Sequence, residues 1–247
     1  MKKEKLWIFG DSHCDPTYRN DLTYVAWPVA IKKTIKVINY SIAGSGPDYQ
    51  LQKFIDAVKK SKNGKLKNIS VFFVIPSIYR FNLKFINNVT PRHQSLSEVY
   101  AVHLNNNWDL ETREKMLNLV GEEFGEHCSF LDLFLHEYVL YSTYTQTEML
   151  KIITILKEMS KYFKKMYVVS AGCPVDLEFC KGFKLSIENT KNFYCSKDTV
   201  NNVFPPTYGF GNDPRNNHLP KHAHKNLLTK IENWLHTGNT FDFKEID

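Results

Sequence analysis

The sequence predicts an α/β fold built on a mostly parallel sheet. Short apolar runs alternate along the chain with stretches in which apolar residues recur at helical spacing, a pattern typical of parallel strands joined by helical crossovers. Each apolar run stops at small residues or proline, as strands do where they leave a sheet. The chain has 247 residues, 43% of them apolar, which suits one α/β domain with one core.

Four apolar runs are predicted to be strands: Lys5–Phe9, Ile35–Tyr40, Ile69–Ile75 and Met166–Ser170. Three helices are predicted from apolar residues that recur on one face. Their inward-facing residues are Leu51, Phe54, Ile55 and Val58 after Asp48; Met149, Ile152, Ile153, Leu156, Met159 and Phe163; and Leu227, Leu228, Ile231 and Trp234 in a last helix from about Lys221 to Trp234.

Two long stretches do not follow this alternation. Residues 82–145 are rich in aromatic residues and short charged runs, and we expect them to form a mostly helical insertion or cap over the substrate pocket of the single domain 1–247. Residues 185–217, which include Pro205, Pro206, Gly209 and Gly211, are expected to run irregularly over the carboxyl edge of the sheet.

Charge and cysteine content narrow the class of protein. The net charge is +6, but the lysines are spread along the chain, so no nucleic-acid partner is expected. The first apolar run is too short for a signal peptide or a membrane span. Five cysteines without a Cys-x-x-Cys pair favour a reducing, cytoplasmic setting, or association with a virion if the protein is of viral origin.

A serine follows the first strand directly, in Ile8-Phe-Gly-Asp-Ser-His13. The carboxyl edge of a parallel sheet is where open α/β folds build their sites, and a tight turn there directs a backbone N–H group to the same point. Ser12 is therefore the candidate nucleophile. A serine needs a base to take its proton, and His218, in the loop before the last helix, is the candidate base; a surface or capping role for His218 is the alternative.

The chain resembles the GDSL/SGNH hydrolase superfamily, particularly its divergent phage, viral and bacterial versions. Phe9-Gly-Asp-Ser-His13 resembles the first block of the family, Asn39-Tyr-Ser-Ile-Ala-Gly44 the second, and His218-Leu-Pro-Lys-His-Ala-His224 the last; the Trp27-Pro28 pair is also similar to those divergent members. The resemblance implies a three-layer α/β/α sandwich with a mostly parallel central sheet, the flavodoxin-like SGNH fold. It also implies hydrolysis of acyl esters, first of all acetyl esters of small molecules or glycans, without a metal or other cofactor.

The same resemblance implies the other site residues. The oxyanion would be met by the N–H groups of Ser12 and Gly44. The family's third block, Gly-x-Asn, is replaced by Ile75-Pro-Ser-Ile-Tyr-Arg80, so Ser77 is only a candidate for the side-chain donor. Arg80 either steers an anionic substrate or forms a salt bridge. The family's aspartate three residues before the histidine is replaced by arginine, which leaves Asp213 as the candidate acid, or a serine–histidine dyad without one.

Two other classes of function stay open. Asp11-x-His13 together with His222-x-His224 resembles the metal ligands of metallophosphoesterases, but the bridging aspartate and the Asn-His pair of such enzymes do not appear where required. The altered third block and the displaced aspartate instead favour a virion- or glycan-associated binding protein that keeps the scaffold of a hydrolase without its activity.

Overall fold

The computed structural model describes residues 5–15, 26–33, 35–43, 45–61, 65–76, 80–82, 101–103, 142–172, 189–203, 219 and 221–246. For a few of these, including 80–82, 101–103 and 142–145, it describes the backbone alone.

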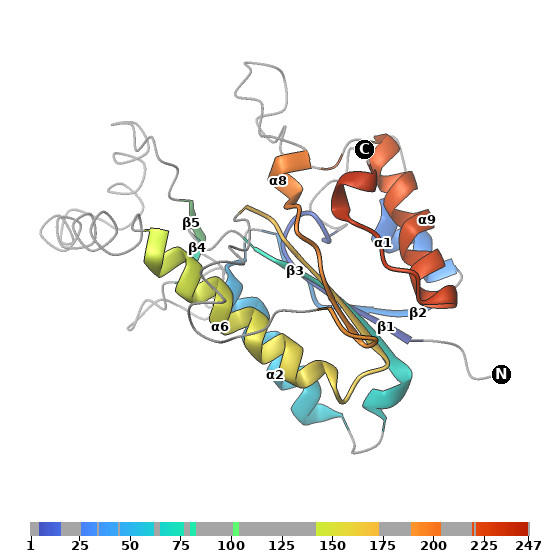
Figure 1. The fold of residues 1–247 in the computed structure, drawn as a ribbon, viewed down its shortest axis with the longest axis horizontal. Helices are drawn as coiled ribbons and strands as arrows, with labels where there is room; N and C mark the ends of the chain where they lie inside the picture. Colours follow the sequence, from blue (N-terminus) through green and yellow to red (C-terminus); the bar gives the residue numbers. More distant parts are fainter. Residues whose placement is uncertain are drawn as a thin grey trace, which may run out of the picture.

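A parallel sheet of five strands forms the centre of the protein (Figure 1). Its strand order is β2-β1-β3-β6-β7, and every neighbouring pair is parallel. The bounds of the strands are Lys5–Phe9 for β1, Lys36–Asn39 for β2, Ile69–Ile75 for β3, Lys165–Ser170 for β6 and Phe193–Cys195 for β7. This sheet with its helices confirms the predicted α/β class.

Helices connect the strands and flank the sheet. The α-helices are α1 (Trp27–Ala30), α2 (Pro47–Lys60), α6 (Ser142–Ser160), α8 (Val200–Val203) and α9 (Lys221–Thr237), and the 3₁₀ turns are η2 (Ile31–Lys33), η3 (Leu66–Asn68) and η6 (Phe243–Ile246). In the part of the chain that the structure describes, no helix combines the length and the apolar character needed to cross a membrane.

Both faces of the sheet are buried. Every residue of β3 is buried, as expected for a central parallel strand with helices on both sides. Alternate residues contribute to different clusters: Phe72 packs in the cluster that includes Trp27 of α1 and Ile231 of α9, whereas Phe73 packs in the cluster that includes Phe54 of α2 and several residues of α6. Figure 1 accordingly shows α2 and α6 on one side of the sheet and α1 and α9 on the other.

The strand predictions are confirmed closely, and the main difference lies in the second irregular stretch. β1 and β3 have the predicted bounds, β2 is one residue shorter than predicted at each end, and β6 begins one residue earlier than predicted. The prediction that residues 185–217 are irregular was wrong at β7, a three-residue edge strand, and at the short helix α8. Three residues are too few to produce the alternation or the apolar run by which a strand is recognised in sequence.

Within the stretch predicted to be a helical insertion, the structure describes strand residues at Asn82 and Ala101–His103 and helix at residues 142–145, where α6 begins. Arg80–Asn82 (β4) and Ala101–His103 (β5) form an antiparallel pair, separate from the main sheet. Residues 83–100 and 104–141 lie outside the described residues, so the helical insertion as a whole stays a prediction.

Candidate active site

The turn after β1 places Ser12 at the carboxyl edge of the sheet. The N–H groups of Cys14 and Asp15 both donate to the Asp11 carbonyl at 3.0 Å, and the His13 N–H donates to the Asp11 carboxylate at 3.1 Å. Gly10 opens the turn with a φ of +151°, a conformation that L side chains rarely adopt. Asp11, His13 and Cys14 are buried, whereas Ser12 is half-buried, so among these four residues it is Ser12 that is partly exposed to solvent.

The topology of the sheet makes this edge a natural binding position. The chain passes from β1 to β2 on one side, and then crosses to β3 on the other side of β1. Connections that leave neighbouring strands in opposite directions open a crevice at the carboxyl ends of those strands, and ligands of open α/β proteins bind at such points. Ser12 follows β1, the strand from which the two directions diverge.

The loop between β2 and α2 is hydrogen-bonded to the serine turn along its length. The Ile42 N–H donates to the Gly10 carbonyl at 3.0 Å, and the Ala43 N–H donates to the Asp15 carboxylate at 2.9 Å. The Asn39 side-chain amide donates to the Cys14 carbonyl at 2.8 Å. The two segments therefore form one structural unit at the sheet edge.

Two buried polar side chains, Gln50 and Ser45, add further hydrogen bonds to the same unit. Gln50, in the first turns of α2, is fully buried, and its Oε1 accepts from the Gly10 N–H at 3.1 Å. Its Nε2 donates to Ser45 Oγ at 2.8 Å, and Ser45 Oγ donates to the Gly10 carbonyl at 3.4 Å. Buried polar groups of this kind are costly unless they are paired, and here each has a partner.

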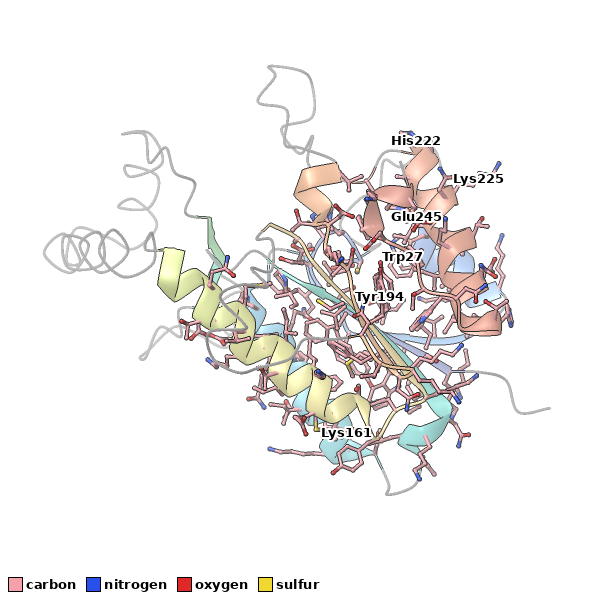
Figure 2. All side chains as sticks on the ribbon, in the orientation of Figure 1. Trp27, Lys161, Tyr194, His222, Lys225 and Glu245 are labelled. Atoms are coloured by element: carbon pink, nitrogen blue, oxygen red, sulfur yellow. The ribbon has the colours of Figure 1, made fainter. Side chains whose placement is uncertain are left out.

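Helix α9 is attached to the serine turn through Trp27. The indole N–H of Trp27 donates to the His13 carbonyl at 3.3 Å, and the Trp27 backbone N–H donates to His224 Nδ1 at 3.3 Å. Leu219, just before α9, is buried in the same apolar cluster as Cys14 and Trp27. Figure 2 shows the Trp27 side chain between α9 and the sheet, so the first and last blocks of the sequence meet in the fold.

The carboxylates of the turn affect the pKa of its one thiol, that of Cys14. Burial raises the pKa of the Cys14 thiol well above its usual value, and the negative charges of Asp11 and Asp15 raise it further. Because the neutral form is favoured, Cys14 is a packing residue at neutral pH, next in the chain to a histidine and two residues from the candidate nucleophile.

The structure describes part of the predicted site. Ser12 stands at the predicted strand-to-turn position, and Arg80 lies at the start of β4, opposite His103, with its side chain outside the described part. The other predicted site residues, Gly44, Ser77, Asp213 and His218, lie outside the described residues. Within the described residues, no group of three or more His, Cys, Asp or Glu side chains is arranged to hold a metal ion.

Sequence reasoning assigned no role to several residues that organise this edge. Gln50 is the clearest, because it lies on the buried face of α2 with Leu51 and Phe54. A polar residue on an otherwise apolar helix face is the signal that could have drawn attention to it, since a buried polar side chain is more informative than an exposed apolar one. Asn39 and Trp27 were noted only as parts of family-like motifs.

Comparison with known proteins assigns no family to this arrangement. No protein-family model matches the sequence, and no curated protein matches it. A function for the chain therefore rests on its own residues and their positions.

Proposed function

We propose that the protein is a serine esterase that hydrolyses acyl esters, first of all acetyl esters, with Ser12 as nucleophile and His218 as general base. The observation that carries the proposal is the position of Ser12, half-buried on a tight turn at the carboxyl end of β1, where the sheet topology opens a crevice. That is the position at which an exposed hydroxyl meets both a substrate and backbone N–H donors.

The fold proposed with this function is a three-layer α/β/α sandwich of the flavodoxin-like SGNH kind. Two observations support it. The order β2-β1-β3-β6-β7 corresponds to 2-1-3-4-5 when the strands of the main sheet are numbered along the chain, which is the flavodoxin-like order. Apolar clusters with helices lie on both faces of the sheet.

In the proposed reaction, Ser12 Oγ attacks the carbonyl carbon of the ester while His218 takes the hydroxyl proton. The tetrahedral oxyanion is stabilised by the N–H groups of Ser12 and Gly44, and it collapses as His218 returns the proton to the leaving alcohol. Water then hydrolyses the acyl-enzyme with the same base. The role of Gly44 is supported by its two neighbours, which are hydrogen-bonded to the serine turn. The Ala43 N–H donates to the Asp15 carboxylate, and the Ser45 hydroxyl donates to the Gly10 carbonyl.

The choice of His218 as base is supported by its chain neighbours. Leu219 is buried with Cys14 in one apolar cluster, and α9 is hydrogen-bonded to Trp27, which is in turn bonded to the serine turn. His218 directly precedes the buried Leu219 in the chain. Asp213 is proposed to orient the imidazole, with a serine–histidine dyad as the alternative form of the site.

The proposed substrates are esters of small molecules or glycans. A glycan O-acetyl group presents a small acyl chain and a polar alcohol, which suits a site formed at an open sheet edge. Ser77 is proposed as a side-chain donor to the oxyanion and Arg80 as a contact for an anionic substrate, with a structural salt bridge as the alternative role of Arg80.

Labelling with a fluorophosphonate tests the proposal. We expect the parent protein to be labelled at Ser12 and to hydrolyse p-nitrophenyl acetate, and Ser12→Ala to lose both properties while it keeps the parent's thermal unfolding midpoint. Ser61→Ala is the matched control, because Ser61 is a half-buried serine at the end of α2 whose hydroxyl donates locally, to the Ala57 carbonyl. Equal labelling of the parent and Ser12→Ala would contradict the proposal.

The same assay separates the two other classes of function. A binding protein on a hydrolase scaffold would show neither Ser12-dependent labelling nor ester hydrolysis. A metallophosphoesterase would hydrolyse p-nitrophenyl phosphate, lose that activity on treatment with a chelator, and retain it in Ser12→Ala.

A further inference from the structure

We propose that Gln50 is a positioning residue that sets the spacing between the two backbone donors of the oxyanion hole. The inference rests on the proposed function, and it assigns a role to a side chain that lies beneath the site and does not touch the substrate. The evidence is the buried set of hydrogen bonds formed by Gln50, Ser45 and Gly10.

These three residues form a closed ring of hydrogen bonds. The Gly10 N–H donates to Gln50 Oε1, Gln50 Nε2 donates to Ser45 Oγ, and Ser45 Oγ donates to the Gly10 carbonyl, at 3.1, 2.8 and 3.4 Å. Gln50 and Ser45 are fully buried, so water does not replace a lost partner. The direction of each bond is fixed, because the Gly10 N–H only donates and its carbonyl only accepts.

The ring joins the two segments that carry the proposed donors. Gly10 lies two residues before Ser12, whose N–H is one donor, and Ser45 follows Gly44, whose N–H is the other. Gln50 itself belongs to α2, which is packed against the sheet through Phe54. The side chain of Gln50 thus connects both segments to one rigid helix.

Close contacts around Gly10 restrict the positions that its backbone can take within the ring of hydrogen bonds. A Cβ atom at Gly10 would lie 2.9 Å from the Val74 Cβ and 3.2 Å from Cys14 Sγ. The glycine backbone is therefore held against β3 on one side, while on the other its N–H is held by Gln50 and its carbonyl by the Ser45 hydroxyl and the Ile42 N–H. A change in Gln50 is expected to move the β2–α2 loop relative to the serine turn, because β3 holds the turn itself in place.

Hydrogen-bond donors stabilise an oxyanion only where they lie at the right distance from the oxygen that forms in the transition state. A misplacement of about 1 Å can cost on the order of 100-fold in rate. A role for Gln50 in spacing the donors therefore predicts a loss in kcat and in the affinity for tetrahedral analogues, with little change in KM.

The test compares Gln50→Met with Gln52→Met. Both changes replace glutamine by a side chain of similar length on the same helix, but Gln52 is exposed and donates to Asp56, one turn further along α2. We expect kcat per fluorophosphonate-labelled site to fall about 10- to 100-fold in Gln50→Met, with KM within about threefold of the parent. The affinity for a trifluoromethyl ketone, which forms a tetrahedral adduct with the serine, should fall by a similar factor. Gln52→Met should match the parent in all three quantities.

Ser45→Ala provides a second variant if Gln50→Met does not fold. It removes one oxygen atom from the ring and should lower kcat per labelled site in the same direction, by about 3- to 10-fold. A merely structural role predicts lower thermal midpoints and fewer labelled sites but an unchanged kcat per site, and that result in the folded variants would overturn the inference. A parent protein without Ser12-dependent labelling would overturn the proposed function and this inference together, whereas a labelled parent with unaffected variants would overturn the inference alone.

Discussion

Replacing Gly10 by alanine should destabilise the protein more than replacing any glycine that has space around it. Gly10 has a φ of +151°, and a Cβ there would meet the Cβ of Val74 at 2.9 Å and the Val74 carbonyl oxygen at 3.3 Å. Val74 belongs to the central strand β3 and is buried in the core, so its neighbours prevent it from shifting away from the added Cβ. Both the backbone conformation and the steric contact therefore oppose the substitution.

The two effects have separable magnitudes. A residue forced into a sparsely populated backbone region costs about 1–3 kcal/mol, and overpacking a buried site costs about 1–3 kcal/mol more. The expected loss in the free energy of unfolding is thus about 2–6 kcal/mol, a large part of the 5–15 kcal/mol that is typical of a folded domain.

Gly238 supplies the matched control. It also has a positive φ, +85°, but within the described part of the protein a Cβ there would meet the end of the Lys165 side chain at 3.5 Å, an ordinary contact distance. Gly238→Ala should therefore cost only the backbone strain, about 1–2 kcal/mol. Urea unfolding of the parent and both variants measures the difference. Equal losses in the two variants, or a Gly10→Ala variant as stable as the parent, would refute the steric reasoning.

Two further predictions concern side chains around the serine turn. Trp27→Phe should lower the free energy of unfolding by about 1–3 kcal/mol more than Trp7→Phe, because it leaves the His13 carbonyl without its indole donor. Trp7 is the control, since its indole nitrogen has no hydrogen-bond partner in the described part of the protein. Equal losses of the two variants on urea unfolding would contradict this prediction. The raised pKa of Cys14 means that its thiol stabilises the fold fully below its unfolded-state pKa and loses this contribution as the pH rises toward the folded-state value. The urea midpoint should therefore fall more steeply in the parent than in Cys14→Ala between about pH 8.5 and 10, and native Cys14 should resist iodoacetamide at pH 8; alkylation of the native protein as fast as of the unfolded chain would count against this.

The central strands were predictable because a strand that is buried on both faces consists almost entirely of apolar residues. Ile69–Ile75 contains six apolar residues and one serine, followed by a proline, and it forms β3 with the predicted bounds. β7 was not predictable in the same way, because a three-residue edge strand is defined by its pairing with β6 and by no run of its own. Helix α1, four residues long, is likewise defined by its contacts with α9 more than by any periodicity.

The site was predictable where a residue type and its place in the chain both signal chemistry. Ser12 was found because a Gly-Asp-Ser turn follows the first strand, and the structure places it at the carboxyl edge. Gln50 was not singled out, because its hydrogen-bond partners lie 40 residues away at Gly10 and five residues away at Ser45. Hydrogen bonds between distant segments leave no periodic trace in the sequence, so only the fold brings these residues together.

A double-mutant comparison of Ser12 and His218 tests the proposed site most directly. Residues that act as one catalytic unit lose activity together, so Ser12→Ala, His218→Ala and the double variant should all hydrolyse p-nitrophenyl acetate at the same residual rate, within about threefold. A His218→Ala variant that keeps the parent's rate, or a double variant whose loss is the product of the two single losses, would contradict a shared nucleophile–base site.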